Sequence, residues 1–241
     1  MAITLDDIRR PIEVNIGEFD AFVRKNFSEE QGTLIGDMLE YVLSSRGKGL
    51  RPIVVMLAAG ATSPTGNFGN ILAGYYAMQM GLPVNKLICA SNINNVLTDF
   101  INTGVYDRNR QFYATVSPSM DILISSNLER LLFEVTGKDA AKVSSWMKAL
   151  SEDGVYQVDP TTLKALQRQF VGGFADEIGI TKTIIDVYDR TDNVIDTHTA
   201  VGFNIYNRYH QRSKDETVTI FASTASPFKF APAVMDAIRG N

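Results

Sequence analysis

The hydrophobic pattern of the chain changes near residue 60, and this change limits the possible folds more than any other feature of the sequence. Before it, apolar residues recur at steps of three and four, which places them on one face of a helix: Ile8, Ile12, Ile16, Phe19, Phe22 and Val23. After it, β-prone runs alternate with helical stretches; the runs are 86–90 and 217–222, and the stretches are 128–135, 140–150, 163–170 and 199–209. Such alternation favours a layered α/β structure with a largely parallel sheet. We therefore expect an all-α helical segment over residues 1–60 and an α/β domain over residues 61–241.

Two helix starts can be placed from their capping residues. Asp159 stands before Pro160, and proline suits the first turn of a helix because the amide there has no helical partner to lose. The run Ser-Ser-Asn at 125–127 has the same capping character ahead of Leu128. These signals predict helices that begin at residues 160 and 128.

Composition excludes several classes of function. With 23 Lys and Arg against 27 Asp and Glu, the formal net charge is -4, which gives no overall basic field for nucleic acid. A single cysteine, Cys89, excludes disulfides and thiolate metal clusters, and two histidines leave little room for a multi-histidine metal site. The longest apolar stretch, 53–61, is too short to cross a bilayer, and the first residues carry acids where a signal peptide carries Lys or Arg. We expect a cytoplasmic protein with no metal, no nucleic-acid partner and no membrane span.

A glycine-rich loop is the strongest chemical signal in the sequence. Gly66 and Gly69 are three residues apart, are flanked by Thr and Asn, and precede a stretch that can be helical. Small side chains expose backbone amides, and the start of a helix adds partial positive charge at the same point, so such a loop can hold a phosphate without a lysine. Neither the dinucleotide fingerprint nor the P-loop pattern fits. From the residues alone, a plain turn before a helix remains the alternative.

The region from about residue 62 to the end resembles the threonine synthases, which are pyridoxal-phosphate enzymes of fold type II. The resemblance begins in the glycine loop, at Pro64 to Gly81. Five further motifs follow in the same order as in that family: 88–100 (ICASNINNVLTDF), 117–122 (SPSMDI), 126–131 (SNLERL), 195–202 (IDTHTAVG) and 223–230 (STASPFKF). The resemblance implies the layered fold of that class, present in part.

The resemblance also implies a cofactor and a set of site residues. The residues that would wrap the phosphate of pyridoxal phosphate are Gly66, Asn67, Phe68, Gly69 and Asn70. Thr224 would face the pyridine nitrogen, where a neutral hydroxyl leaves that nitrogen largely unprotonated. The residues that would line the substrate side are Asn92, Asn94 and Asn95. The implied reaction converts a small-molecule phosphate ester, O-phosphohomoserine, and water into threonine and phosphate.

One departure from the family concerns the lysine that binds the cofactor covalently. In the family this Schiff-base lysine precedes the phosphate loop by well over a hundred residues, in a Ser-Phe-Lys-Asp context. Here only about 60 residues precede the loop, and no lysine stands in that context; Lys229 belongs to the later 223–230 motif. We therefore expect an incomplete, inactive chain with no catalytic residue. The alternative is a non-catalytic module that binds phosphate or pyridoxal phosphate, or that assembles with a partner.

The first 60 residues resemble a different family. Arg46 to Ala59 is similar to the first motif of trans-polyprenyl diphosphate synthases, in which a Lys and an Arg bind a diphosphate. By this resemblance Lys48 and Arg51 are candidate diphosphate ligands, and the other reading is a basic turn between two helices. The aspartate-rich magnesium motifs of that family are absent from the sequence, so a polyprenyl synthase fragment is the least favoured alternative. We expect a join near residue 60, by fusion or as an artefact, and self-association through uncovered apolar faces.

Two single residues complete the candidates. His198 lies in a family motif at a helix start, where it either faces the site or is a capped or surface residue. Cys89 lies in a predicted strand with no histidine near it in sequence, which favours a buried apolar role over a nucleophilic one.

Overall fold

The computed structural model describes residues 61–62 and 68–240, which all belong to one unit, Ala58–Asn241. The predicted helical segment and its candidate ligands Lys48 and Arg51 lie outside the described residues, so the boundary at residue 60 stays a prediction. In chain order the described elements are β1 (Ala61–Thr62), α5 (Gly69–Gln79), β2 (Leu87–Ser91), α6 (Val96–Thr103), β3 (Val105–Asp107), η4 (Pro118–Met120), α7 (Leu128–Val135), α8 (Ala140–Glu152), β4 (Val155–Gln157), α9 (Pro160–Gln169), β5 (Phe170–Phe174), α10 (Glu177–Thr191), α11 (Thr197–Ser213), β6 (Ile220–Phe221), η5 (Pro227–Phe230) and α12 (Ala231–Arg239).

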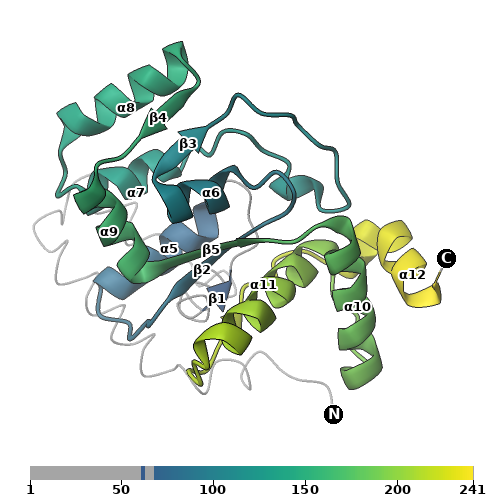
Figure 1. The fold of residues 1–241 in the computed structure, drawn as a ribbon. Helices are drawn as coiled ribbons and strands as arrows, with labels where there is room; N and C mark the ends of the chain where they lie inside the picture. The colour runs from purple at the N-terminus through teal and green to yellow at the C-terminus, as the bar shows by residue number, and fades with distance from the viewer. Residues whose placement is uncertain (1–60, 63–67, 241) are drawn as a thin grey trace, which may run out of the picture. The chain divides into compact units, whose positions relative to one another are not determined.

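Within residues 61–62 and 68–240 the strands form three pairs, and two of them are parallel. β2 pairs with β5 from Leu87↔Phe170 to Ser91↔Phe174, and β1 pairs with β6 at Thr62↔Phe221. β3 and β4 pair antiparallel. Helices alternate with these strands along the chain (Figure 1). The predicted α/β class with a largely parallel sheet is confirmed.

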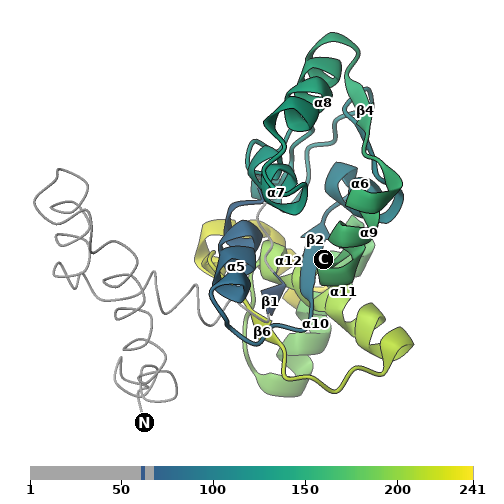
Figure 2. The same ribbon diagram turned by 90° about the vertical axis from the view of Figure 1, so that its left-hand side faces the viewer.

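β2 is buried on both faces and separates two hydrophobic cores. Leu87 and Cys89 point into one core, and Ile88 and Ala90 point into the other. A parallel strand covered by helices on both sides has this continuous burial, because neither face meets water. The first core contains residues of α5 to α9, and the second contains residues of α10, α11 and α12. In Figure 2, α5 lies on one side of β2 and α7 and α8 lie beyond its end.

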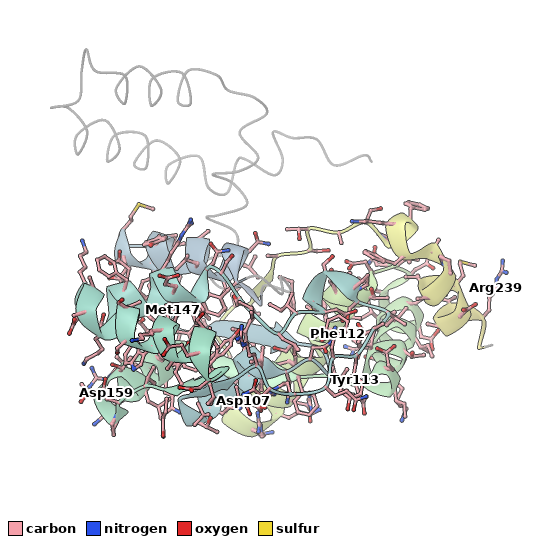
Figure 3. The ribbon with its side chains drawn as sticks, turned by 90° about the horizontal axis from the view of Figure 1, so that it is seen from above. Asp107, Phe112, Tyr113, Met147, Asp159 and Arg239 are labelled. Atoms are coloured by element: carbon pink, nitrogen blue, oxygen red, sulfur yellow. The ribbon has the colours of Figure 1, made fainter. Side chains whose placement is uncertain are left out.

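Aromatic rings fill the first core where β3 and β4 meet α8. Tyr106 and Tyr156 stack with ring centroids 5.3 Å apart and an interplanar angle of 5°. Phe100 and Trp146 pack against Tyr156 at 5.7 and 6.2 Å. Figure 3 shows Met147 of α8 and Asp159, which caps α9, at the end of the unit opposite Arg239 of α12. The small antiparallel sheet is thus held by ring packing as well as by its ladder.

Most of the predicted elements occur, with shifted ends. α7 has the predicted bounds, and Asp159 caps α9 by accepting hydrogen bonds from the amides of Thr161 and Thr162. Asn127 is the N-cap residue of α7, but its side chain makes no capping hydrogen bond there. The strand predicted over 217–222 is wrong in length, because β6 has only the two residues that pair with β1. No helix in the described part of the chain is long and apolar enough to cross a membrane.

Candidate functional site

The candidate site lies at the carboxyl ends of the parallel strands β1 and β6. The chain leaves β1 into the glycine loop and leaves β6 into the segment that holds Thr224. Neighbouring parallel strands end at the same edge of a sheet, and in open α/β sheets ligands bind at this edge. Gly66 and Asn67 lie outside the described residues, whereas Phe68, Gly69 and Asn70 are described.

Phe68 ends the glycine loop and begins α5. It adopts a left-handed conformation with φ 60° and ψ 8°, and its side chain is fully buried, 5.8 Å from Phe170 between ring centroids. The apolar side chain of Phe68, the N-cap residue, makes no capping hydrogen bond to the first amides of α5. Gly69 faces Nδ2 of Asn127, which lies 3.7 Å from where a Cβ would stand. At the start of α5 the ring of Phe68 is buried and Gly69 has no side chain. The first backbone amides of this helix therefore suit an anion.

Thr224 is exposed and follows β6 by three residues. Its neighbour Ser223 is anchored twice: its amide donates to the carbonyl of Phe221 at 3.0 Å, and its Oγ lies 2.8 Å from Oγ1 of Thr199. The hydroxyl of Thr224 is thus presented from a fixed strand end. Its contact with a pyridine nitrogen stays a prediction.

The asparagines after β2 lie in a buried polar network centred on Asp121. Nδ2 of Asn92 donates to Oδ1 of Asp121 at 2.7 Å, and Nδ2 of Asn94 donates to the same oxygen at 3.0 Å. Thr115 donates its amide to Oδ2 and its hydroxyl to Oδ1 of Asp121, at 2.9 and 2.7 Å. Asn94 also exchanges two hydrogen bonds with the backbone of Tyr113, which Figure 3 shows on the segment between β3 and η4. The side chains of Asn92 and Asn94 therefore hold this segment in place.

Asn95 has a different environment and remains half-buried. Its Oδ1 accepts from Nη1 of Arg110 at 3.0 Å, and the same nitrogen lies 2.8 Å from Oδ2 of Asp99. Nε of Arg110 donates to the carbonyl of Asp107 at 2.8 Å. Arg110 thus ties the start of α6 to the residue that ends β3. A role in substrate binding for any of the three asparagines stays a prediction.

The start of α11 contains a buried carboxylate that sequence reasoning missed. Asp196 caps α11 by accepting from the amides of His198 and Thr199 at 2.9 and 3.3 Å, and it is 1% exposed. Burial raises the pKa of Asp196, but hydrogen bonds from the side chains and amides of His198 and Thr199 outweigh it, so the net pKa is lowered. The signal in the sequence was an Asp directly before Thr-His-Thr, a capping pattern.

Metal binding and nucleophilic catalysis by Cys89 are not supported by the described residues. The structure as described, residues 61–62 and 68–240, holds no cluster of three His, Cys, Asp or Glu able to bind a metal. Cys89 is buried in β2, as predicted, and burial raises the pKa of its thiol to about 12. Lys229 is exposed on η5, with Nζ 5.5 Å from the ring centroid of Phe230.

Comparison with known proteins identifies the C-terminal part of the chain. Residues 199–241 match the family model "Threonine synthase, C-terminal". The threonine synthase of Saccharomyces cerevisiae is 39% identical over 191 residues, which cover 73% of this chain and 37% of that protein. The C-terminal part of the chain is therefore similar to the threonine synthases.

Other threonine synthase relatives agree in sequence and in fold. Threonine synthase-like 1 of Homo sapiens is 43% identical over 177 residues, covering 73% of this chain and 23% of that protein. The crystal structure of yeast threonine synthase superposes with a TM-score of 0.70 at 37% identity, over 75% of this chain and 38% of the yeast chain. A PLP-bound threonine synthase from Brucella melitensis superposes with a TM-score of 0.67 at 39% identity, over 73% of this chain and 38% of that one. The chain therefore spans less than two-fifths of the threonine synthases it matches.

Proposed function

We propose that this chain is a threonine-synthase-like protein that binds pyridoxal phosphate at the shared edge of β1 and β6. The observation that supports the proposal is the parallel pairing of these strands, since the glycine loop follows one strand and Thr224 follows the other, although they are about 155 residues apart in sequence. A phosphate-bearing cofactor with a ring at its other end needs both features within reach of each other. The PLP-bound threonine synthase from Brucella melitensis supports the identity of the cofactor.

The residues at this edge fit such a cofactor. Phe68 does not cap the amides at the start of α5 with its side chain, and Gly69 adds no side chain there, so the loop from Gly66 to Asn70 would hold the phosphate. The exposed hydroxyl of Thr224 would face the pyridine nitrogen as a neutral partner. Bound pyridoxal phosphate supplies an electron sink for reactions at the carbon next to an amino group.

The substrate we propose is O-phosphohomoserine, converted with water into threonine and phosphate in the reaction of the family. Asn92 and Asn94 would act indirectly, because their side chains are already bonded to Asp121, Tyr113 and Thr115. They would fix the segment after β3 beside the substrate. Since no lysine stands in the Ser-Phe-Lys-Asp context, we propose that this chain binds the cofactor without turning over substrate.

A titration with pyridoxal phosphate, followed by fluorescence or calorimetry on the full chain, tests the proposal. We expect saturable binding that Gly66→Asp weakens at least tenfold, because an added carboxylate repels the phosphate. Ser145→Asp adds the same charge on the exposed face of α8 and is the matched control, with unchanged affinity. Absence of binding by the unmodified chain would overturn the proposal. Phosphate release from O-phosphohomoserine that Gly66→Asp abolishes would overturn the inactive part of it.

A further inference from the structure

Three segments far apart in sequence are joined by one line of hydrogen bonds. The backbone amide of Ser119 in η4 donates to Nε2 of His198 at 3.1 Å. An amide N–H can only donate, so Nε2 is the unprotonated acceptor and the proton of the neutral ring is on Nδ1. Nδ1 lies 3.1 Å from Oδ1 of Asp196 and therefore donates to that carboxylate. The geometry alone fixes the tautomer of His198.

The line continues from the same carboxylate to the end of β6. Oδ2 of Asp196 accepts the hydroxyl proton of Thr199, and Oγ1 of Thr199 lies 2.8 Å from Oγ of Ser223. Because the one proton of Thr199 goes to Asp196, the hydroxyl of Ser223 donates to Thr199. His198, Asp196 and Thr199 are all at most 3% exposed, so water does not compete for the bonds among these three residues, whereas Ser223 at the end of the line is exposed.

We infer that His198, Asp196 and Thr199 are positioning residues that hold the carboxyl end of β6, and with it Thr224, in a fixed place relative to η4. None of the three needs to touch a ligand for this role. The inference rests on the proposed function only in taking Thr224 as the group that faces a pyridine nitrogen. The hydrogen-bonded line itself is independent of any ligand.

A purely structural role would be the capping of α11, and variants at Thr199 separate the two roles. Asp196 caps α11 through backbone amides, which no side-chain change at Thr199 removes. Thr199→Val has nearly the same shape but lacks the hydroxyl, and Thr199→Ser keeps the hydroxyl. Thr183→Val is the matched control, because Thr183 is also a buried threonine whose hydroxyl donates to the carbonyl of Gly179 within α10 and accepts from Asn204 of α11, without contact with Ser223.

The first experiment needs no cofactor. In the full chain labelled with ¹⁵N-histidine, we expect the imidazole shifts of His198 to be those of the Nδ1-protonated tautomer. We expect Thr199→Val to speed hydrogen exchange of the Ser223 amide about tenfold, the effect of losing one hydrogen bond, while Thr199→Ser and Thr183→Val leave it unchanged. An Nε2-protonated His198, or unchanged exchange in Thr199→Val, would overturn the inference.

The second experiment compares pyridoxal phosphate with its analogue in which carbon replaces the ring nitrogen. We expect Thr199→Val to weaken binding of pyridoxal phosphate about tenfold and binding of the analogue less than twofold, because only the first ligand has a nitrogen for Thr224 to contact. Equal weakening of both would overturn the link to Thr224. If the unmodified chain binds neither ligand, the proposed function fails, and the exchange experiment still decides whether the line of hydrogen bonds holds β6.

Discussion

Nδ2 of Asn92 lies 2.7 Å from Oδ1 of Asp121, so the loop after β2 is held by a carboxylate at the end of η4. The two residues are 29 positions apart, and Asn94 and Thr115 donate to the same carboxylate. One acidic side chain thus joins the loop after β2 to Thr115 and to the end of η4. Its removal leaves several donors without their acceptor.

Asp121→Ala is expected to destabilise the unit by about 3 kcal/mol, because buried donors of Asn92, Asn94 and Thr115 lose a charged acceptor. Urea denaturation followed by circular dichroism measures the loss. Asp186→Ala is the control: its carboxylate makes only an exposed ion pair with Arg190, so its removal costs less than about 1 kcal/mol. Equal losses in the two variants would contradict the organising role of Asp121.

Asp159→Ala is expected to cost about 1 kcal/mol of unfolding free energy, since the side chain caps α9. Asp159→Asn keeps a good capping group and is expected to lose only a few tenths of a kcal/mol. Thermal unfolding of both variants near neutral pH measures the difference. A larger loss in the Asn variant than in the Ala variant would show that the cap is not what Asp159 contributes.

The same residue predicts a dependence of stability on pH. Hydrogen bonds from the hydroxyl and amide of Thr162 lower the pKa of Asp159 from 3.8 to about 2. A lowered folded-state pKa stabilises the fold fully above about pH 4, and that contribution is lost as the pH falls towards 2. The difference in stability between the unmodified chain and Asp159→Asn is therefore expected to shrink over this range. A difference that stays constant from pH 5 to pH 2 would refute the assignment.

Gly173→Ala is expected to destabilise the unit by about 1–3 kcal/mol through overpacking. A Cβ at this position of β5 would stand 2.6 Å from Cγ2 of Ile205 in α11, so strand or helix must shift. In an Ile205→Ala background that atom is gone, and the penalty of Gly173→Ala is expected to fall by at least about 1 kcal/mol. A double-mutant cycle in urea measures this coupling, and additive losses would argue against the contact.

Cys89 is expected to resist thiol reagents in the folded chain. It is 3% exposed within β2, and burial raises the pKa of its thiol to about 12, so almost no thiolate is present at neutral pH. Labelling with a chromogenic disulfide reagent is expected to proceed at the rate of unfolding and to accelerate with urea. Fast labelling without denaturant would place Cys89 on the surface instead.

The sequence predicted correctly the helices whose ends depend on local residue pattern. It failed for the strand whose length depends on a partner strand far away in sequence. α7 has the predicted bounds because Leu128, Leu131 and Leu132 form one buried helical face. The strand predicted over 217–222 shrinks to two residues, because a strand is only as long as its pairing and β1 offers two residues. β propensity alone cannot report the length of a partner strand 159 positions away.

In the candidate site, too, local features could be predicted from the sequence and features set by distant contacts could not. The glycine loop could be found from its residue types, since small residues before a helix have a local physical meaning. Asp121 and Asp196 could not be found as network centres, because an aspartate in a loop or before a helix looks like any other until distant donors surround it. The resemblance to a family supplied Thr224, and the pairing of β1 with β6 gives its position a physical reason.

The pairing of Thr62 with Phe221 also dictates when the site can exist during synthesis. Nearly the whole α/β unit is translated between these two residues, so the glycine loop leaves the ribosome long before the strand that completes its edge. Contacts of such sequence separation form late, after the local helices. Any newly made chain that stops short of residue 224 therefore has the glycine loop without its counterpart, and capture of a ligand that needs both would report that translation had passed that residue.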